Sequence, residues 1–369
     1  MVIISEIPDE SNDGDPSKKP QEPPNPSQEQ PQLPNELIEL CVARVSRCDL
    51  PVISLASKTF RRLIRLPEFE LTRSKLSITE RILYALIGFP PREFPSFYIL
   101  YRQNLSLRLR RVESLPPMHF GSAVVTIGPE IYLIGGCDAD GQRDTTDVFL
   151  IDCRTHTRRS LPSMKVPRCH AAAGVIDGRI YVIGGCKMRS LNWVELFVLK
   201  EQTWIGMKRK KKIDVDIIDR QFHFVAYAVM EKRIYALDRE CSCGKASSCV
   251  VDDRLYTIDP FRNLGHPIVV YDPKDGKWRP VRGVNGLPCN VYGYAYESKM
   301  ANLGGKLVIL VNNQSQWWDY NGEKQIWCVE IALETRQGGE IWGKLESVDL
   351  VLTTIKSPPL IELCQTVTV

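Results

Sequence analysis

Ile131-Tyr-Leu-Ile-Gly-Gly-Cys137 returns almost unchanged 49 residues later as Ile180-Tyr-Val-Ile-Gly-Gly-Cys186. Each stretch is a run of alternating β-formers that stops at a double glycine, where the backbone can adopt φ > 0 and neighbouring chain can approach closely. Self-similarity at such a period indicates a repeat architecture built from one supersecondary unit. The glycines expected to serve the repeat are Gly135, Gly136, Gly184 and Gly185.

The flanks of the two stretches match in the same order. The additional strands expected from these flanks are 121–125 and 147–152 in the first unit, and 171–175 and 193–199 in the second. In the second unit Trp204 follows Phe197 by seven residues, whereas Arg158 holds that place in the first unit. Each unit is predicted to be one four-stranded antiparallel sheet, which cannot bury both faces alone. Stacking the units around an axis would bury them.

Two weaker copies follow. The third has expected strands at 223–227, 233–238 and 268–271 with Trp278 after them, and the fourth has 292–296, 306–311 and 326–330 with Trp342 after them. We expect Trp204, Trp278 and Trp342 to lie in the core between blades. A long insertion at 239–267 would separate the second and third strands of the third unit, a natural place for binding.

The double glycine, the apolar strand and the trailing tryptophan at a period near 50 residues resemble the kelch repeat. The resemblance implies an all-β kelch propeller, for which we expect five blades, with six as the alternative. Residues 77–88 fit either a helix, by a capping box at Ser77 and Glu80, or a strand, and the resemblance favours the strand. The closing blade would combine strands from both ends of the domain, namely 82–87, 97–101, 348–352 and 363–369.

The composition argues against a nucleic-acid-binding, a membrane or a secreted protein. The chain has 369 residues and a formal net charge of +4, too small a surplus to indicate a nucleic-acid partner. It has no apolar run of about 18 residues, and residues 1–30 lack the basic start and apolar core of a signal peptide, so no membrane partner is expected. The 12 cysteines should therefore stay reduced, in the cytoplasm or the nucleus, without disulfides.

Before the repeats the chain changes character at Leu33. Residues 1–32 are rich in Pro, Glu, Gln, Asp and Ser and offer almost nothing to bury, so we expect a disordered tail. Asn35 is the expected cap of a first helix, Asp49 caps a second, and a third ends before Pro67. Three short amphipathic helices form little core alone and need a partner.

The order Leu33-Pro-Asn-Glu-Leu37, Asp49-Leu50 and Leu55-Ala-Ser-Lys-Thr-Phe-Arg-Arg-Leu-Ile64 resembles an F-box over 33–68. An F-box followed by kelch repeats is a known plant arrangement. The resemblance divides the chain into a tail (1–32), an F-box helical module (33–75) and a kelch propeller (78–369). The alternative is a generic helical cap on the propeller. The resemblance implies docking to the Skp-type adaptor of a cullin-RING ubiquitin ligase through Leu33, Pro34, Leu37, Leu50, Pro51, Val52 and Leu55.

The sequence does not indicate a metal-binding or catalytic set of residues. Cys241, Cys243 and Cys249 do not match a structural zinc pattern, so we expect no metal and no cofactor. His119, His170 and His223 recur with the repeat and are explained by it, so no catalytic triad is indicated. The chain is therefore not expected to be an enzyme.

Two further stretches could serve binding. Lys208-Arg-Lys-Lys-Lys212 fits a nuclear import signal, a patch for an acidic partner or a solvated connection between blades, the last being favoured. Trp317 and Trp318 lie in a polar loop of the fourth unit and are candidate target-binding anchors, or else cover the edge of the propeller.

We therefore expect a non-catalytic substrate receptor of a Skp–cullin–F-box ubiquitin ligase. Its F-box would dock the adaptor, and through it a cullin, while the propeller holds an unknown target protein. The alternative is a kelch scaffold that binds a partner without degradation. The receptor requires Leu37, Leu50 and Pro51 to be exposed, whereas the scaffold allows them to be buried against the propeller. The ubiquitin role rests on family resemblance, which the fold alone cannot convert into function.

Overall fold

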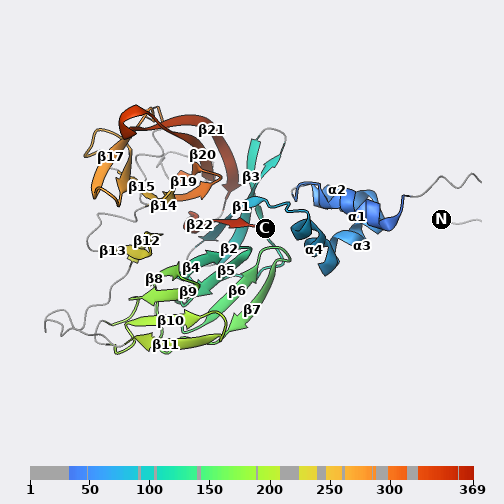
Figure 1. Ribbon diagram of the computed structural model, residues 1–369, viewed down its shortest axis with the longest axis horizontal. Helices are drawn as coiled ribbons and strands as arrows, with labels where there is room; N and C mark the ends of the chain where they lie inside the picture. The colour runs from blue at the N-terminus through green and yellow to red at the C-terminus, as the bar shows by residue number, and fades with distance from the viewer. Residues whose placement is uncertain are drawn as a thin grey trace, which may run out of the picture.

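A small helical module stands beside a ring of β-sheets (Figure 1). The computed structural model describes residues 33–47, 49–89, 93–103, 106–138, 143–187, 190–207, 224–238, 247–259, 262–284, 286–287, 298–313, 323–355 and 357–369. The tail predicted at 1–32 lies outside these residues, as do the first strand predicted for the fourth unit (292–296) and His223.

Four helices form the module, one more than the sequence indicated. They are α1 (Asn35–Ala43), α2 (Leu50–Ala56), α3 (Lys58–Ile64) and α4 (Pro67–Lys75). Pro34, not Asn35, is the residue before the first helical turn, and Asp49 precedes α2 without a side-chain cap bond, so neither predicted polar cap forms. Ser57 does cap α3, because its hydroxyl accepts from the Thr59 N–H at 3.1 Å.

The helices close around a small core of Val42, Ala43, Leu50 and Phe69. Phe69 is fully buried and comes from α4, the helix absent from the prediction, which starts at a proline. Proline suits this position because the first helical N–H has no partner within the helix in any case. The fourth helix supplies the core that three short helices could not have formed among themselves.

The rest of the chain is β-structure with a single short 3₁₀ helix (Gln337–Gly339) among the described residues after α4. The strands are β1 (Arg81–Phe89), β2 (Glu93–Gln103), β3 (Ser106–Arg111), β4 (Ala123–Ile127), β5 (Glu130–Ile134), β6 (Val148–Asp152), β7 (Thr157–Leu161), β8 (Ala172–Ile176), β9 (Arg179–Ile183), β10 (Val194–Val198), β11 (Thr203–Met207), β12 (Phe224–Met230), β13 (Arg233–Asp238), β14 (Ser248–Val251), β15 (Arg254–Ile258), β16 (Ile268–Asp272), β17 (Lys277–Arg282), β18 (Lys299–Leu303), β19 (Lys306–Asn313), β20 (Lys324–Thr335), β21 (Ile341–Thr354) and β22 (Leu360–Thr368).

The two clear repeats each form the predicted four-stranded antiparallel meander. β4-β5-β6-β7 is one sheet and β8-β9-β10-β11 is another. β14 to β17 and β18 to β21 form two further meanders, which are joined edge to edge by a short parallel pairing of β17 with β21. β12 and β13 pair only with each other among the described strands.

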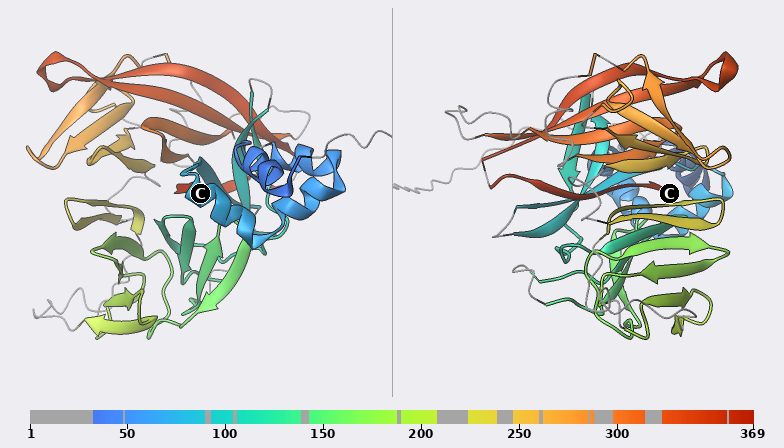
Figure 2. Two further views of the ribbon diagram at one scale, coloured as in Figure 1. Left: turned by 45° about the vertical axis from the view of Figure 1, so that its right-hand side comes forward. Right: turned by 90° about the vertical axis from the view of Figure 1, so that its left-hand side faces the viewer.

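The innermost strands close a ring. β4 contacts β8, β8 contacts β12, β12 contacts β14, β14 contacts β18, β18 contacts β22, and β22 returns to β4. Figure 2 shows these strand groups arranged around a common axis, with the helices to one side. The ring therefore has six strand groups, where the sequence favoured five blades.

The closing sheet has the order β22-β1-β2-β3, so its innermost strand comes from the end of the chain and the other three from the start of the domain. The strand interpretation of 82–87 and 97–101 is confirmed, and so is closure by 363–369. The assignment of 348–352 to this sheet was wrong, because these residues belong to β21 and pair with β20. The fourth place is taken by β3, which the sequence analysis did not identify.

The insertion expected at 239–267 was also misinterpreted. Residues 248–258 form β14 and β15, which pair with β16 and β17 as one meander. The predicted third unit therefore combined strands of two groups, β12–β13 and β14–β17, and this merger produced the count of five. The tight turn at Asp252 and Asp253, with both residues at positive φ, links two β-runs that lack a glycine marker.

The double glycine allows consecutive units to meet. Gly135 has φ +68°, and a side chain there would collide with the backbone oxygen of Arg168, which belongs to the next unit. The neighbouring Gly136 N–H donates to that same oxygen at 2.8 Å. Glycine is required at this position both for the backbone conformation and for the close approach.

A buried ion pair fastens the second unit. Arg168 and Glu195 have fully buried side chains 3.0 Å apart. Arg168 also donates to the carbonyls of Gly184, Asn192 and Trp193, and Glu195 accepts the Lys165 N–H at 2.8 Å. The pair thereby connects the double-glycine turn to two loops, with most of its polar atoms hydrogen-bonded.

The repeat tryptophans differ in burial. Trp204 stacks against Phe197 at 5.0 Å, is 8% exposed and donates its indole N–H to the Pro162 carbonyl. Trp278 makes the equivalent pair with Tyr271 at 5.2 Å but is 46% exposed. The expected position between blades is therefore wrong for Trp278. Trp342 is partly buried, with the Arg336 guanidinium 4.0 Å from its ring centre.

Replacing Glu195 by glutamine should lower the free energy of unfolding by about 3–5 kcal/mol, because Arg168 would keep a buried charge without its counter-charge. Urea unfolding of the full chain measures the change. The control is Asp177→Asn, which removes an exposed pair with Lys232 and should change stability by less than about 1 kcal/mol. Equal effects of the two substitutions would contradict the role given to Arg168.

Candidate functional site

The helical module leaves apolar side chains uncovered. Leu33 and Leu37 are 61% and 47% exposed at the start of α1, and Val52 and Leu55 are 67% and 75% exposed on α2. We call these four residues the docking surface. The side chains that α1 and α2 give to the helical core, such as Val42 and Leu50, are a separate set. These helices therefore leave apolar side chains exposed in addition to those that they bury, which is typical of an interaction site.

A polar junction joins the module to the ring. Arg73 of α4 is 1% exposed and donates to the carbonyls of Ala43 and Val45 at 2.8 and 2.6 Å and to the Glu80 carboxylate at 2.5 Å. The same carboxylate accepts the Arg47 N–H at 3.1 Å. One residue thus holds the C-terminal end of α4 and the loop between α1 and α2.

Glu80 also belongs to the propeller. It precedes β1, and its N–H and C=O pair with the C=O and N–H of Val369 at 2.8 and 2.9 Å. This residue therefore connects the module to the innermost and second strands of the closing sheet. Because Arg47 is additionally bonded to Glu70 of α4, the junction contains two ion pairs.

Buried titratable groups lie close to the junction. Tyr84 of β1 donates to the Cys153 carbonyl at 3.2 Å and lies 2.8 Å from the Nε2 atom of His156. Burial raises the pKa of the Tyr84 phenol, which therefore stays protonated. Burial, followed by the charges of Arg47 and Arg110, lowers the pKa of His156 and keeps its imidazole neutral. These groups contribute hydrogen bonds between closing sheet and first unit rather than a reactive centre.

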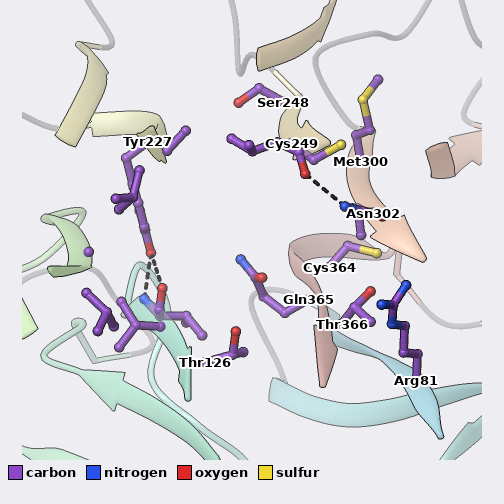
Figure 3. Close-up of a pocket in the computed structure, with 18 of the residues that line it drawn as sticks. Arg81, Thr126, Tyr227, Ser248, Cys249, Met300, Asn302, Cys364, Gln365 and Thr366 are labelled. Atoms are coloured by element: carbon purple, nitrogen blue, oxygen red, sulfur yellow. Dashed lines mark hydrogen bonds between the residues drawn. The ribbon is translucent and has the colours of Figure 1, made fainter. Parts of the chain in front are cut away.

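The ring encloses a central cavity of about 730 Å³. All six innermost strands contribute to its wall, and Figure 3 shows side chains from several of them facing the open space. Tyr227 of β12 reaches across to β4, where its hydroxyl donates to the Val124 carbonyl at 3.0 Å and accepts the Val124 N–H at 2.6 Å. Asn302 of β18 similarly donates to the Val250 carbonyl at 3.1 Å.

The described residues hold no grouping of three or more His, Cys, Asp or Glu side chains suited to a metal ion. Cys249 belongs to no such grouping, and burial raises the pKa of its thiol. His119 lies 3.7 Å from Asp147. Nor is any helix of the described chain long and apolar enough to cross a membrane.

Comparison with known proteins identifies both parts. Residues 97–352 match the FKB95 kelch-repeats domain, and residues 31–72 match the F-box domain. The chain belongs to the F-box/kelch-repeat family. An F-box/kelch-repeat protein of Arabidopsis thaliana is 43% identical over 100% of both chains, and a kelch repeat-containing protein of the same plant is 45% identical over 100% of both. An F-box/LRR-repeat/kelch-repeat protein of that plant is 45% identical over 98% of each chain.

The F-box residues predicted from the sequence do not all share one surface. Leu33, Pro34, Leu37, Val52 and Leu55 are exposed. Leu50 is 6% exposed because it fills the core of the module, which corrects the expectation that it faces a partner. Pro51 lies in α2, and its side chain is outside the described set.

The candidate binding positions of the kelch part lie largely outside the described residues. This applies to Trp317, Trp318, the basic run 208–212, and the thiols of Cys241 and Cys243. Cys249 is described, and it belongs to β14 rather than to a loop.

Sequence reasoning missed two features of the F-box module. Leu66 and Leu71, at the start of α4, are 42% and 58% exposed and extend the apolar surface of the module. Glu80 was considered only as part of a capping box, whereas it joins the module to the propeller. The continuous apolar run from Ile82 to Ile87 was the available signal for a strand. A strand there leaves no helix for the capping box to cap.

Replacing Glu80 by alanine should lower the free energy of unfolding by about 2–4 kcal/mol, because Arg73 would lose the counter-charge of a nearly buried guanidinium. This is less than for a fully buried pair, since the Glu80 side chain is 26% exposed. Chemical unfolding followed by the far-ultraviolet helical signal measures it. The exposed Glu36 on α1 is the matched control, and a loss at Glu80 no larger than at Glu36 would contradict this account of the junction.

Proposed function

We propose that this protein is the substrate-recognition subunit of a ubiquitin ligase of the Skp–cullin–F-box type. Residues 33–75 act as the adaptor-docking module and residues 78–369 as the propeller that holds the target. The main support for this proposal is the exposed apolar docking surface. The F-box match indicates an adaptor role, but it does not indicate which side chains would contact the adaptor.

The docking surface suits a protein partner. Its four side chains are aliphatic, and they come from two helices that share one core. Burying such side chains contributes about 1.5–3 kcal/mol each, so a few of them can dominate an interface. The F-box match supports a Skp-type adaptor, itself bound to a cullin, as this partner.

The ligase reaction needs no catalytic group in this chain. Holding a target at a fixed place beside a charged enzyme raises the effective concentration of its lysines. The Arg73–Glu80 junction supports this role, because it links the docking module to the closing sheet with charge-assisted bonds on both sides. The neutral, buried His156 and Tyr84 next to the junction add to its packing.

The proposal implies action in the cytoplasm, the nucleus or both, where cullin-type ligases work and where free thiols persist. The buried cysteines fit this setting, since Cys137, Cys153, Cys169 and Cys186 are all unpaired thiols. Loops of the kelch part would bind the target protein. The sequence of these loops does not indicate what kind of protein the target is.

Capture of a purified Skp-type adaptor by the full chain tests the proposal. Leu37→Glu together with Val52→Glu should weaken capture at least about tenfold, because each carboxylate would have to lose its water in an apolar interface. Thermal unfolding should be unchanged, since both side chains are exposed already.

The control is Leu191→Glu, which changes a leucine that is 82% exposed on the propeller. It should leave adaptor capture unaltered. Failure of the folded parent chain to capture any Skp-type adaptor would overturn the ligase proposal, and the protein would then be treated as a kelch scaffold.

A further inference from the structure

The central cavity contains polar side chains that the fold does not use. The hydroxyl of Thr366 on β22 is buried and has no hydrogen-bond partner within the described chain. Arg81 of β1, an exposed residue, also lines the cavity and forms no ion pair with any described residue. In contrast, two other polar groups of the wall are already hydrogen-bonded: Tyr227 of β12 bonds across the ring to β4, and Asn302 of β18 bonds to the neighbouring β14.

Arg81 and Thr366 lie on the same face of the closing sheet. Arg81 pairs with Thr368, and Thr366 lies two positions before Thr368 on β22, so the three side chains share one side of the sheet. In Figure 3, Arg81, Thr366 and Gln365 come from adjoining strands at the same part of the cavity. The guanidinium lies beside the Gly304 turn, 3.8 Å from where a side chain at Gly304 would begin.

The position of Arg81 is not explained by the repeat. β9, β13 and β15 also begin with an arginine, at Arg179, Arg233 and Arg254. None of these lines the cavity, and Arg254 is bonded to Asp272 at 3.0 Å. Arg81 differs because its strand has no hairpin turn to the innermost strand. β1 pairs instead with β22, a strand far away in the sequence.

The charge of the wall favours a monoanion. Arg81 and Asp252 are the two charged side chains that line the cavity, and Asp252 interacts electrostatically with Arg254. A single uncompensated guanidinium can balance one negative charge, and its planar donors match a carboxylate. The part of the wall formed by Ala173, Gly174 and Val175 of β8, two strands away from β22 in the ring, is small and apolar. The volume is within the range of small-molecule sites.

We infer that the central cavity binds a small organic monocarboxylate, with its carboxylate on Arg81 and Thr366 and its apolar part toward β8. This site goes beyond adaptor docking and is separate from the docking surface. The ligand would connect β22 with β8, two innermost strands that are not neighbours in the ring. Binding would therefore stabilise the closed ring.

Ligand-observed NMR on the full chain tests this with probes that differ only in charge. Benzoate, phenylacetate and hexanoate are each compared with benzamide, phenylacetamide and hexanamide. The carboxylates should bind and their amides should not. Arg81→Gln should weaken binding at least about tenfold, because it removes a charge-assisted bond while preserving length. Arg179→Gln, at the matched position of β9, should have no effect.

Thr366→Val separates a ligand role from a structural one. It removes an unpaired buried hydroxyl at nearly constant volume, so the melting temperature should be unchanged or higher while carboxylate binding weakens. Equal binding of acids and amides, binding that survives Arg81→Gln, or absence of binding by a folded parent chain would each overturn the inference. Adaptor capture by Arg81→Gln should match the parent, so failure here is distinguishable from failure of the ligase proposal.

Discussion

The ion pair between Arg73 and Glu80 is the contact on which the arrangement of the two parts depends. Arg73 is buried beneath two carbonyls of the helical module, and Glu80 is paired through its backbone with Val369. Burying a guanidinium without a counter-charge costs free energy. Moving the two parts away from each other would leave the buried Arg73 in that state. The pair therefore fixes where an adaptor held by α1 and α2 would lie relative to the propeller.

The propeller depends on a different constraint, the closing of a ring by strands from distant parts of the chain. β22 is the innermost strand of a sheet whose other strands precede every repeat. Such closure removes exposed sheet edges and orders the termini of the domain. It also creates the two features with functional content, because the junction at Glu80 and the cavity position of Arg81 both arise where a hairpin turn is missing from the closing sheet.

Much of this was accessible from the sequence. Gly135 and Gly184 mark the repeat because only glycine permits close approach of the next unit, so the first three strands of each complete repeat were predicted. Where the marker is absent, as at Asp252, the strands of two groups were merged. Leu50 fits the helical stripe equally well as core or as surface, and pattern alone cannot separate them. The cavity residues could not be predicted, because their approach depends on ring closure.

The most direct test of the account is hydrogen–deuterium exchange of the full chain with and without a Skp-type adaptor. Protection should appear over α1 and α2, which carry the docking surface, while the innermost strands β4 and β8 keep the exchange rates of the free chain. Protection confined to the propeller, or no protection by an adaptor present in excess, would contradict the claim that the helical module is the docking site.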